Sequence, residues 1–215
     1  MHLENSQNKL FLKQLIYFGA NLSFEEDLSE MKSHFQDMEL FVVTATLQLS
    51  WNVRITHSFL SWLKRYSPLL CPSKMRRLFK ITKYNPDMLG VLVALIKEND
   101  PRPKRWDILK PYFKKNSGKI LFFPHIPKPF GDIDVRKMSF DFEKYLLPKK
   151  TVLNSCPEIK NRALMSGVLS ADVLTAVRKQ PELTTSYQIA KITHHHRAQV
   201  HMVLKISKQV GYVLL

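Results

Sequence analysis

The chain has 215 residues, of which 45% are hydrophobic, 24% charged and 11% aromatic, with 12 prolines and 6 glycines. This composition excludes disordered, collagen-like and disulfide-scaffold proteins and is typical of one large or two small folded domains. The unusual quantity is charge, because 33 Lys and Arg against 18 Asp and Glu leave a net charge of +15. A polyanion is therefore the first partner to consider, with nucleic acid ahead of an anionic membrane surface.

Cysteine spacing and hydropathy favour a cytoplasmic protein. Cys71 and Cys156 are 85 residues apart and match no zinc-binding spacing, so neither a disulfide framework nor a structural zinc site is predicted. The longest uncharged run, residues 40–53, is too short and too polar to span a bilayer. The first 25 residues lack the pattern of a signal peptide. We expect no membrane partner and no cofactor.

Residues 1–100 are predicted to form a helical domain. Apolar side chains recur at helical spacing in residues 10–18 and 55–63. Residues 85–87 combine an N-cap asparagine, a first-turn proline and an acidic side chain near the positive end of the helix dipole, so they predict a further helix start. Residues 1–50 carry 3 basic and 7 acidic side chains, which favours packing or self-association over contact with a polyanion.

Most of the positive charge lies in residues 51–131, which hold 17 basic and 4 acidic side chains. A short basic helix is predicted there, and its Lys74, Arg76 and Arg77 are predicted to contact phosphate groups. The alternative interpretation is a solvated helix face with no partner, which is common for such clusters.

Residues 101–159 are predicted to form a proline-rich connecting region. Its first half, residues 101–130, contains six prolines, and this density leaves room only for short helices or strands. The apolar run 119–123 is consistent with a buried strand. We therefore expect a mainly α protein with a minor β contribution in this region.

The C-terminal domain, residues 160–215, is predicted to contain three closely spaced helices. After Glu182 the chain has no acidic residue, so a surface built from this segment would not repel phosphate. A small residue at Ala190 allows the second and third helices to cross closely. The side chains expected to face inward are Val173, Leu174 and Val177 from the first helix, Ile189, Ala190 and Ile192 from the second, and Val200, Val203, Leu204 and Ser207 from the third.

The segment 170–215 resembles the winged-helix form of the helix-turn-helix that many bacterial transcription regulators contain. Residues 189–193 match the end of the scaffold helix in that family, and residues 197–205 match its recognition helix. His194 stands where the family usually has a turn glycine, a position that requires positive φ, and histidine tolerates this better than most residues. Residues 210–214 resemble the first strand of the wing, although the chain stops before a second wing strand.

The resemblance implies a DNA-binding protein that regulates transcription, with double-stranded DNA as its partner. The third helix is predicted to lie in the major groove, with its basic residues on phosphate and its polar residues on base edges. The C-terminal residues expected to contact DNA are His195, His196, Arg197, Gln199, His201, Lys205 and Lys208.

Two other functions remain open. Small helical triads also serve as protein contacts, so the chain is alternatively an interaction module such as an adaptor or an antitoxin-like partner. Asp132 and Asp134 share one face of a strand as the metal-binding pair of nucleotidyltransferases does, but the Gly-Ser signature of that family is missing. Consecutive histidines on a turn point in different directions and predict no metal site. An enzyme is therefore not expected.

Overall fold

The computed structural model describes residues 2–23, 26–49, 53–113, 120–121, 132–133, 142–165 and 167–210, and over these residues the protein is mainly helical, as predicted. The α-helices are α1 (His2–Tyr17), α2 (Ser29–Ser33), α3 (Met38–Ala45), α4 (Val53–Tyr66), α5 (Pro72–Leu78), α6 (Pro86–Asn99), α7 (Lys149–Ser155), α8 (Pro157–Leu164), α9 (Val168–Lys179), α10 (Ser186–Thr193) and α11 (Arg197–Gln209). The 3-10 elements are η1 (Ser67–Leu69), η2 (Pro103–Tyr112) and η4 (Phe142–Tyr145). Among the described residues, no helix is both long and apolar enough to cross a membrane.

Several helix starts follow from local side-chain chemistry. The carboxamide of Asn85 accepts hydrogen bonds from the first-turn amides of α6, which confirms the predicted N-cap. Thr185 and Gln188 form a reciprocal capping box at the start of α10. Asp37 caps α3 in the same way as Asn85 caps α6, by accepting from the amides of Glu39 and Leu40.

The larger hydrophobic core is built by α1, α3, α4, α5 and α6 around packed aromatic rings. The ring centroids of Phe18, Phe41 and Trp62 lie between 5.1 and 5.6 Å apart. This core also takes in side chains from residues 101–159, the segment predicted to be a connecting region, namely Trp106, Leu109, Leu146, Val152, Cys156 and Ile159. That segment therefore packs as part of the larger unit.

A small antiparallel ladder lies within the same segment. β1 (Ile120–Leu121) pairs with β2 (Asp132–Ile133), with Ile120 opposite Ile133. Of the expected strand at residues 119–123, the structure describes residues 120 and 121. Asp134, the second carboxylate of the nucleotidyltransferase-like pair, lies outside the described residues.

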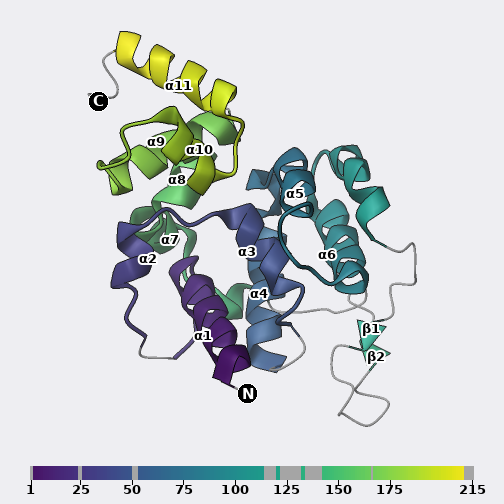
Figure 1. The fold of residues 1–215 in the computed structure, drawn as a ribbon. Helices are drawn as coiled ribbons and strands as arrows, with labels where there is room; N and C mark the ends of the chain where they lie inside the picture. The colour runs from purple at the N-terminus through teal and green to yellow at the C-terminus, as the bar shows by residue number, and fades with distance from the viewer. Residues whose placement is uncertain are drawn as a thin grey trace.

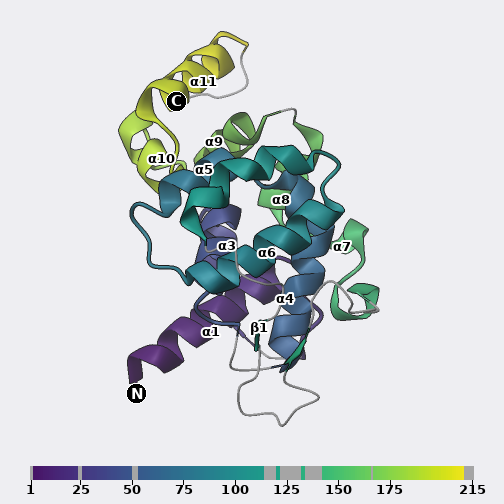
Figure 2. The ribbon, with the colours of Figure 1, turned by 90° about the vertical axis from the view of Figure 1, so that its right-hand side faces the viewer.

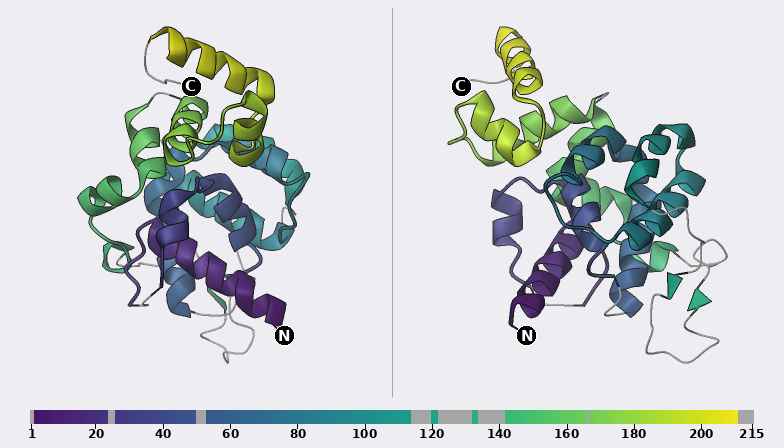
Figure 3. Two further views of the ribbon diagram at one scale, coloured as in Figure 1. Left: turned by 60° about the vertical axis from the view of Figure 1, so that its left-hand side comes forward. Right: turned by 45° about the vertical axis from the view of Figure 1, so that its right-hand side comes forward.

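The smaller core joins α9, α10 and α11, which lie at the opposite end of the molecule from the N-terminus (Figures 1, 2 and 3). The predicted inner faces of the three helices are confirmed. The buried members are Val173, Leu174, Val177, Ile189, Ala190, Val200, Leu204 and Ser207, whereas Ile192 and Val203 are half-buried. Phe35, from the segment before α3, also packs into this core.

Candidate nucleic-acid interface

The turn between α10 and α11 consists of three consecutive histidines, residues 194–196. His194 has φ +54° and ψ +31°, the left-handed conformation that the sequence predicted at this position. A left-handed residue directly after a helix reverses the chain sharply, so α11 starts three residues after α10 ends. Of the three side chains, His196 is exposed, whereas His194 and His195 turn toward the interior.

The surface of α11 is divided into a basic and an apolar flank. Its predicted contact residues Arg197, His201, Lys205 and Lys208 are all exposed. At 100° per residue these four side chains fall within about 80° of one another, so they form one continuous flank. We call these four residues the basic flank.

The opposite flank of α11 is largely apolar. Met202, Ile206 and Val210 are exposed by 62%, 55% and 70%, and their spacing places them on one side of the helix. Gln199 is also exposed but points about 160° away from His201 at 100° per residue. The two residues predicted to meet base edges therefore lie on different sides of α11.

Two predicted contact residues are not on the surface, and the prediction is corrected for them. Lys74 is fully buried, with its ammonium group surrounded by carboxylates, and it cannot reach a phosphate group from this position. The side chain of His195 is only 5% exposed, and its Nε2 lies 3.0 Å from Oδ2 of Asp172. Polar and charged side chains of this kind ordinarily face solvent. These two are buried instead, because Asp37 and Asp172 are their acidic partners.

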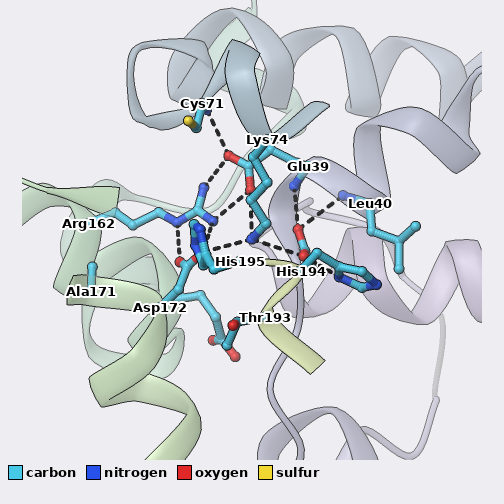
Figure 4. Close-up of polar contacts among 12 residues, drawn as sticks. Glu39, Leu40, Cys71, Lys74, Arg162, Ala171, Asp172, Thr193, His194 and His195 are labelled. Atoms are coloured by element: carbon cyan, nitrogen blue, oxygen red, sulfur yellow. Dashed lines mark hydrogen bonds and ion pairs between the residues drawn. The ribbon is translucent and has the colours of Figure 1, made fainter. Parts of the chain in front are cut away.

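A cluster of buried charged side chains lies beside the histidine turn (Figure 4). Lys74 Nζ lies 2.9 Å from Asp37, 3.3 Å from Glu39 and 2.7 Å from Asp172. The guanidinium of Arg162 donates to both oxygens of Glu39 and to both oxygens of Asp172, at 2.6 to 2.8 Å. The cluster therefore ties α3, α5, α8 and α9 together.

The turn histidines complete this cluster. Nδ1 of His194 lies 2.8 Å from Oδ2 of Asp37, and His195 contacts Asp172. Lys74 and Arg162 thus face the three carboxylates of the cluster, and the two rings lie against two of these carboxylates. The turn that precedes α11 is thus anchored through both of its inward side chains.

Charge pairing overrides burial in this cluster. Burial alone would raise the pKa of Asp172, but Arg162 and Lys74 hold that pKa far below the ordinary value for aspartate. Burial acts on Asp37 in the same direction, and Lys74 together with the hydrogen bond from His194 again lowers its pKa. Burial would lower the pKa of Lys74, yet the carboxylates of Asp172, Asp37 and Glu39 raise it. All three side chains are therefore ionised at neutral pH.

A groove of about 550 Å³ runs between the end of α5, α10 and the histidine turn. Its apolar lining includes Leu78, Ile81 and Ala190, and its basic lining includes Arg76, Arg77, Lys80, Lys191 and His196. No acidic side chain is among the described residues that line it. Nη2 of Arg77 donates to the backbone carbonyl of His194 at 3.0 Å, which joins α5 to the turn.

Lys80 belongs to the basic cluster that the sequence predicted as a second region of phosphate contact, whereas Lys191 was given no contact role. Lys80 follows Arg76 at helical spacing, and Lys191 lies in the last turn of α10, so the sequence shows both as basic residues on or beside a helix. What the sequence lacked was the placement of α5 beside α10, which brings these lysines to one groove.

Comparisons with known proteins add no family to this description. No family model matches the chain, and neither a curated protein nor a solved structure is significantly similar to it. Among the described residues, no group of three His, Cys, Asp or Glu side chains is arranged to hold a metal ion.

Proposed function

We propose that this protein binds double-stranded DNA as a transcription regulator and that α11 is its reading helix. The observation that carries the proposal is the left-handed turn at His194, which presents α11 as an outward helix with an exposed, acid-free basic flank. A helix held in this way by two supporting helices is the arrangement that enters the major groove in helix-turn-helix proteins. The winged-helix resemblance of the sequence supports the same function. Of the expected wing strand, residues 210–214, only Val210 is among the described residues.

The side chains of α11 would divide the contact between phosphates and bases. Arg197, Lys205 and Lys208 are long cations suited to phosphate, which gives affinity without sequence preference. His201 on the basic flank and Gln199 on the opposite flank carry donors and acceptors for base edges. Lys74 and His195 would act only by holding the turn in place.

The decisive experiment is a selection of bound duplexes from a random pool, carried out on the wild type and on single variants. Lys205→Ala should weaken binding to all sequences alike, whereas Gln199→Ala should change the selected motif, at about 1–3 kcal/mol per lost base contact. Lys150→Ala is the matched control, because Lys150 is exposed on α7, away from α11 (Figure 1). The proposal fails if the wild type selects no motif, or if the α11 variants bind like the control.

A protein-interaction module is the second candidate, and the apolar flank of α11 favours it. Met202, Ile206 and Val210 expose a continuous apolar strip, which is typical of a helix that packs against a partner. A Met202→Glu variant should then abolish partner binding, whereas Lys205→Ala should leave it intact. If Lys205→Ala instead abolishes binding and Met202→Glu leaves it intact, DNA binding is favoured over a protein partner.

A further inference from the structure

We propose that the groove between α5 and the α10–α11 turn binds phosphodiester groups of the DNA backbone. Residues near α5 would then contact the same DNA strand that passes the start of α11. This inference rests on the proposed function and adds a second contact surface to it. The groove-binding residues are Arg76, Lys80, Lys191 and His196.

The charge of the groove suits a phosphate backbone. Arg76, Lys80 and Lys191 are exposed and reach the groove from two different helical segments, α10 and the α5 region. Lysine and arginine form charge-assisted hydrogen bonds with phosphate oxygens. Because no described lining residue is acidic, an anion entering the groove meets attraction on both sides.

The start of α11 adds backbone donors at the same place. His196 lines the groove and is also the N-cap residue of α11, and its side chain forms no capping hydrogen bond. The first amides of a 13-residue helix therefore remain available beside the basic side chains. Free N–H groups and the positive end of the helix dipole favour a phosphate at this position.

The groove is held in shape by contacts that cross between the two cores. Arg77 bonds to the carbonyl of His194, and the ion cluster of Lys74, Asp37 and Asp172 lies directly beneath the turn. Both walls are thus fixed before a ligand arrives. A preformed site loses less conformational entropy on binding, which raises its affinity for the same contacts.

The position of the groove favours a backbone strand over a small phosphorylated ligand. The groove is adjacent in sequence and in space to the basic flank, because Arg197 directly follows His196. A strand contacted by Arg197 would therefore continue toward Arg76 and Lys80. A small phosphorylated ligand would contact the groove residues but would not reach the basic flank.

The test is the salt dependence of duplex binding, measured by fluorescence anisotropy on the full chain. Each lost phosphate contact lowers the slope of log Kd against log salt concentration by about 0.9, which is about eightfold in affinity between 0.1 and 1 M salt. The double variant Arg76→Ala/Lys80→Ala loses two phosphate contacts, so we expect its slope to fall by about 1.8. Lys191→Ala loses one contact, and its slope should fall by about 0.9. Lys150→Ala removes one positive charge on α7, which lies away from α11 (Figures 1 and 2) and does not line the groove, so this variant should keep the wild-type slope.

The selected DNA motif separates this inference from the proposed function. If the wild type selects a motif and Gln199→Ala changes it, but the groove variants keep the slope of Lys150→Ala, DNA binding stands and the groove proposal is overturned. If the groove variants select a different motif from the wild type, the groove residues contact bases and not the backbone. That result would also overturn the groove proposal. The groove variants could instead abolish binding of inorganic pyrophosphate or an acidic peptide and leave duplex binding unchanged. That result would mean that the groove binds another ligand, and it would overturn the groove proposal. No duplex binding by the wild type would remove both proposals together.

Discussion

Nζ of Lys74 lies 2.7 Å from Oδ2 of Asp172, a contact that joins α5 to α9 across 98 positions of the sequence. Both side chains are almost completely excluded from water. A buried ion pair adds little net stability compared with apolar residues of the same size, but it allows few alternative arrangements. We therefore regard this contact as the feature that fixes the three C-terminal helices on the larger unit.

Removing the buried ammonium group should be strongly destabilising. Lys74→Met fills similar volume but leaves three carboxylates without their shared cation, so we expect the free energy of unfolding to fall by about 3–5 kcal/mol. Urea denaturation followed by circular dichroism measures this. Lys80→Met, an exposed change on the neighbouring turn, is the control and should stay within about 0.5 kcal/mol of the wild type. Equal stability of the two variants would contradict the cluster.

Acid should weaken the protein through the same carboxylates. The pKa values of Asp37 and Asp172 lie far below that of unfolded aspartate, which is about 3.9. For a depressed pKa, the stabilisation is complete above the unfolded value and is lost as pH falls through the folded value. Stability should therefore be level above about pH 5 and decline steadily below about pH 4.

A variant identifies the carboxylates that are responsible. Asp172→Asn should lower stability at neutral pH and should also flatten its decline below about pH 4, because one depressed carboxyl no longer titrates. Thermal unfolding at several pH values measures both effects. A decline as steep as in the wild type would assign the acid sensitivity to other groups.

The left-handed turn residue should respond to backbone freedom. His194→Gly and His194→Val both lose the contact with Asp37, but only glycine adopts positive φ without strain. We expect the valine variant to be less stable than the glycine variant by about 1–2 kcal/mol. The comparison requires chemical denaturation of the two variants side by side. Equal stability would mean that the turn takes another conformation in solution.

A second buried polar contact also joins distant elements. The hydroxyl of Tyr17 in α1 donates to Oε2 of Glu158 at 2.7 Å, and Lys179 in α9 lies 2.8 Å from Oε1 of Glu158. Burial, with Cys156 and Glu158 adding to it, raises the pKa of Tyr17 well above its ordinary value, so its hydroxyl remains a donor.

Loss of that hydroxyl should be measurable. Tyr17→Phe removes a hydrogen bond to a charged acceptor and should cost about 1.5–3 kcal/mol of unfolding free energy. Tyr187→Phe is the matched control, because Tyr187 is 61% exposed and should tolerate the change. The contact between α1 and α8 is refuted if the two variants have the same denaturation midpoint.

Local patterns of the sequence determined the helical elements and their inner faces. The triplet Asn85-Pro86-Asp87 defined a helix start because an N-cap acts within its own first turn. The spacing of Val200 and Leu204 identified the buried side of α11, since helical periodicity is a local property. The positive φ of His194 is what the winged-helix resemblance implied, because His194 stands where that family usually has a turn glycine.

Only the tertiary structure decided which charges are buried and which meet across the fold. Lys74 and His195 carry the same local signals as Arg76 and His196, yet the side chains of the first pair are buried against Asp37 and Asp172, whereas Arg76 and His196 are exposed. Burial of a charge depends on opposite charges from distant segments, because desolvation is too costly without them. Sequence spacing carries no information about partners on other elements, such as Asp172, which is 98 positions from Lys74. The position of α5 beside α10, which creates the groove, is fixed by those same long-range contacts.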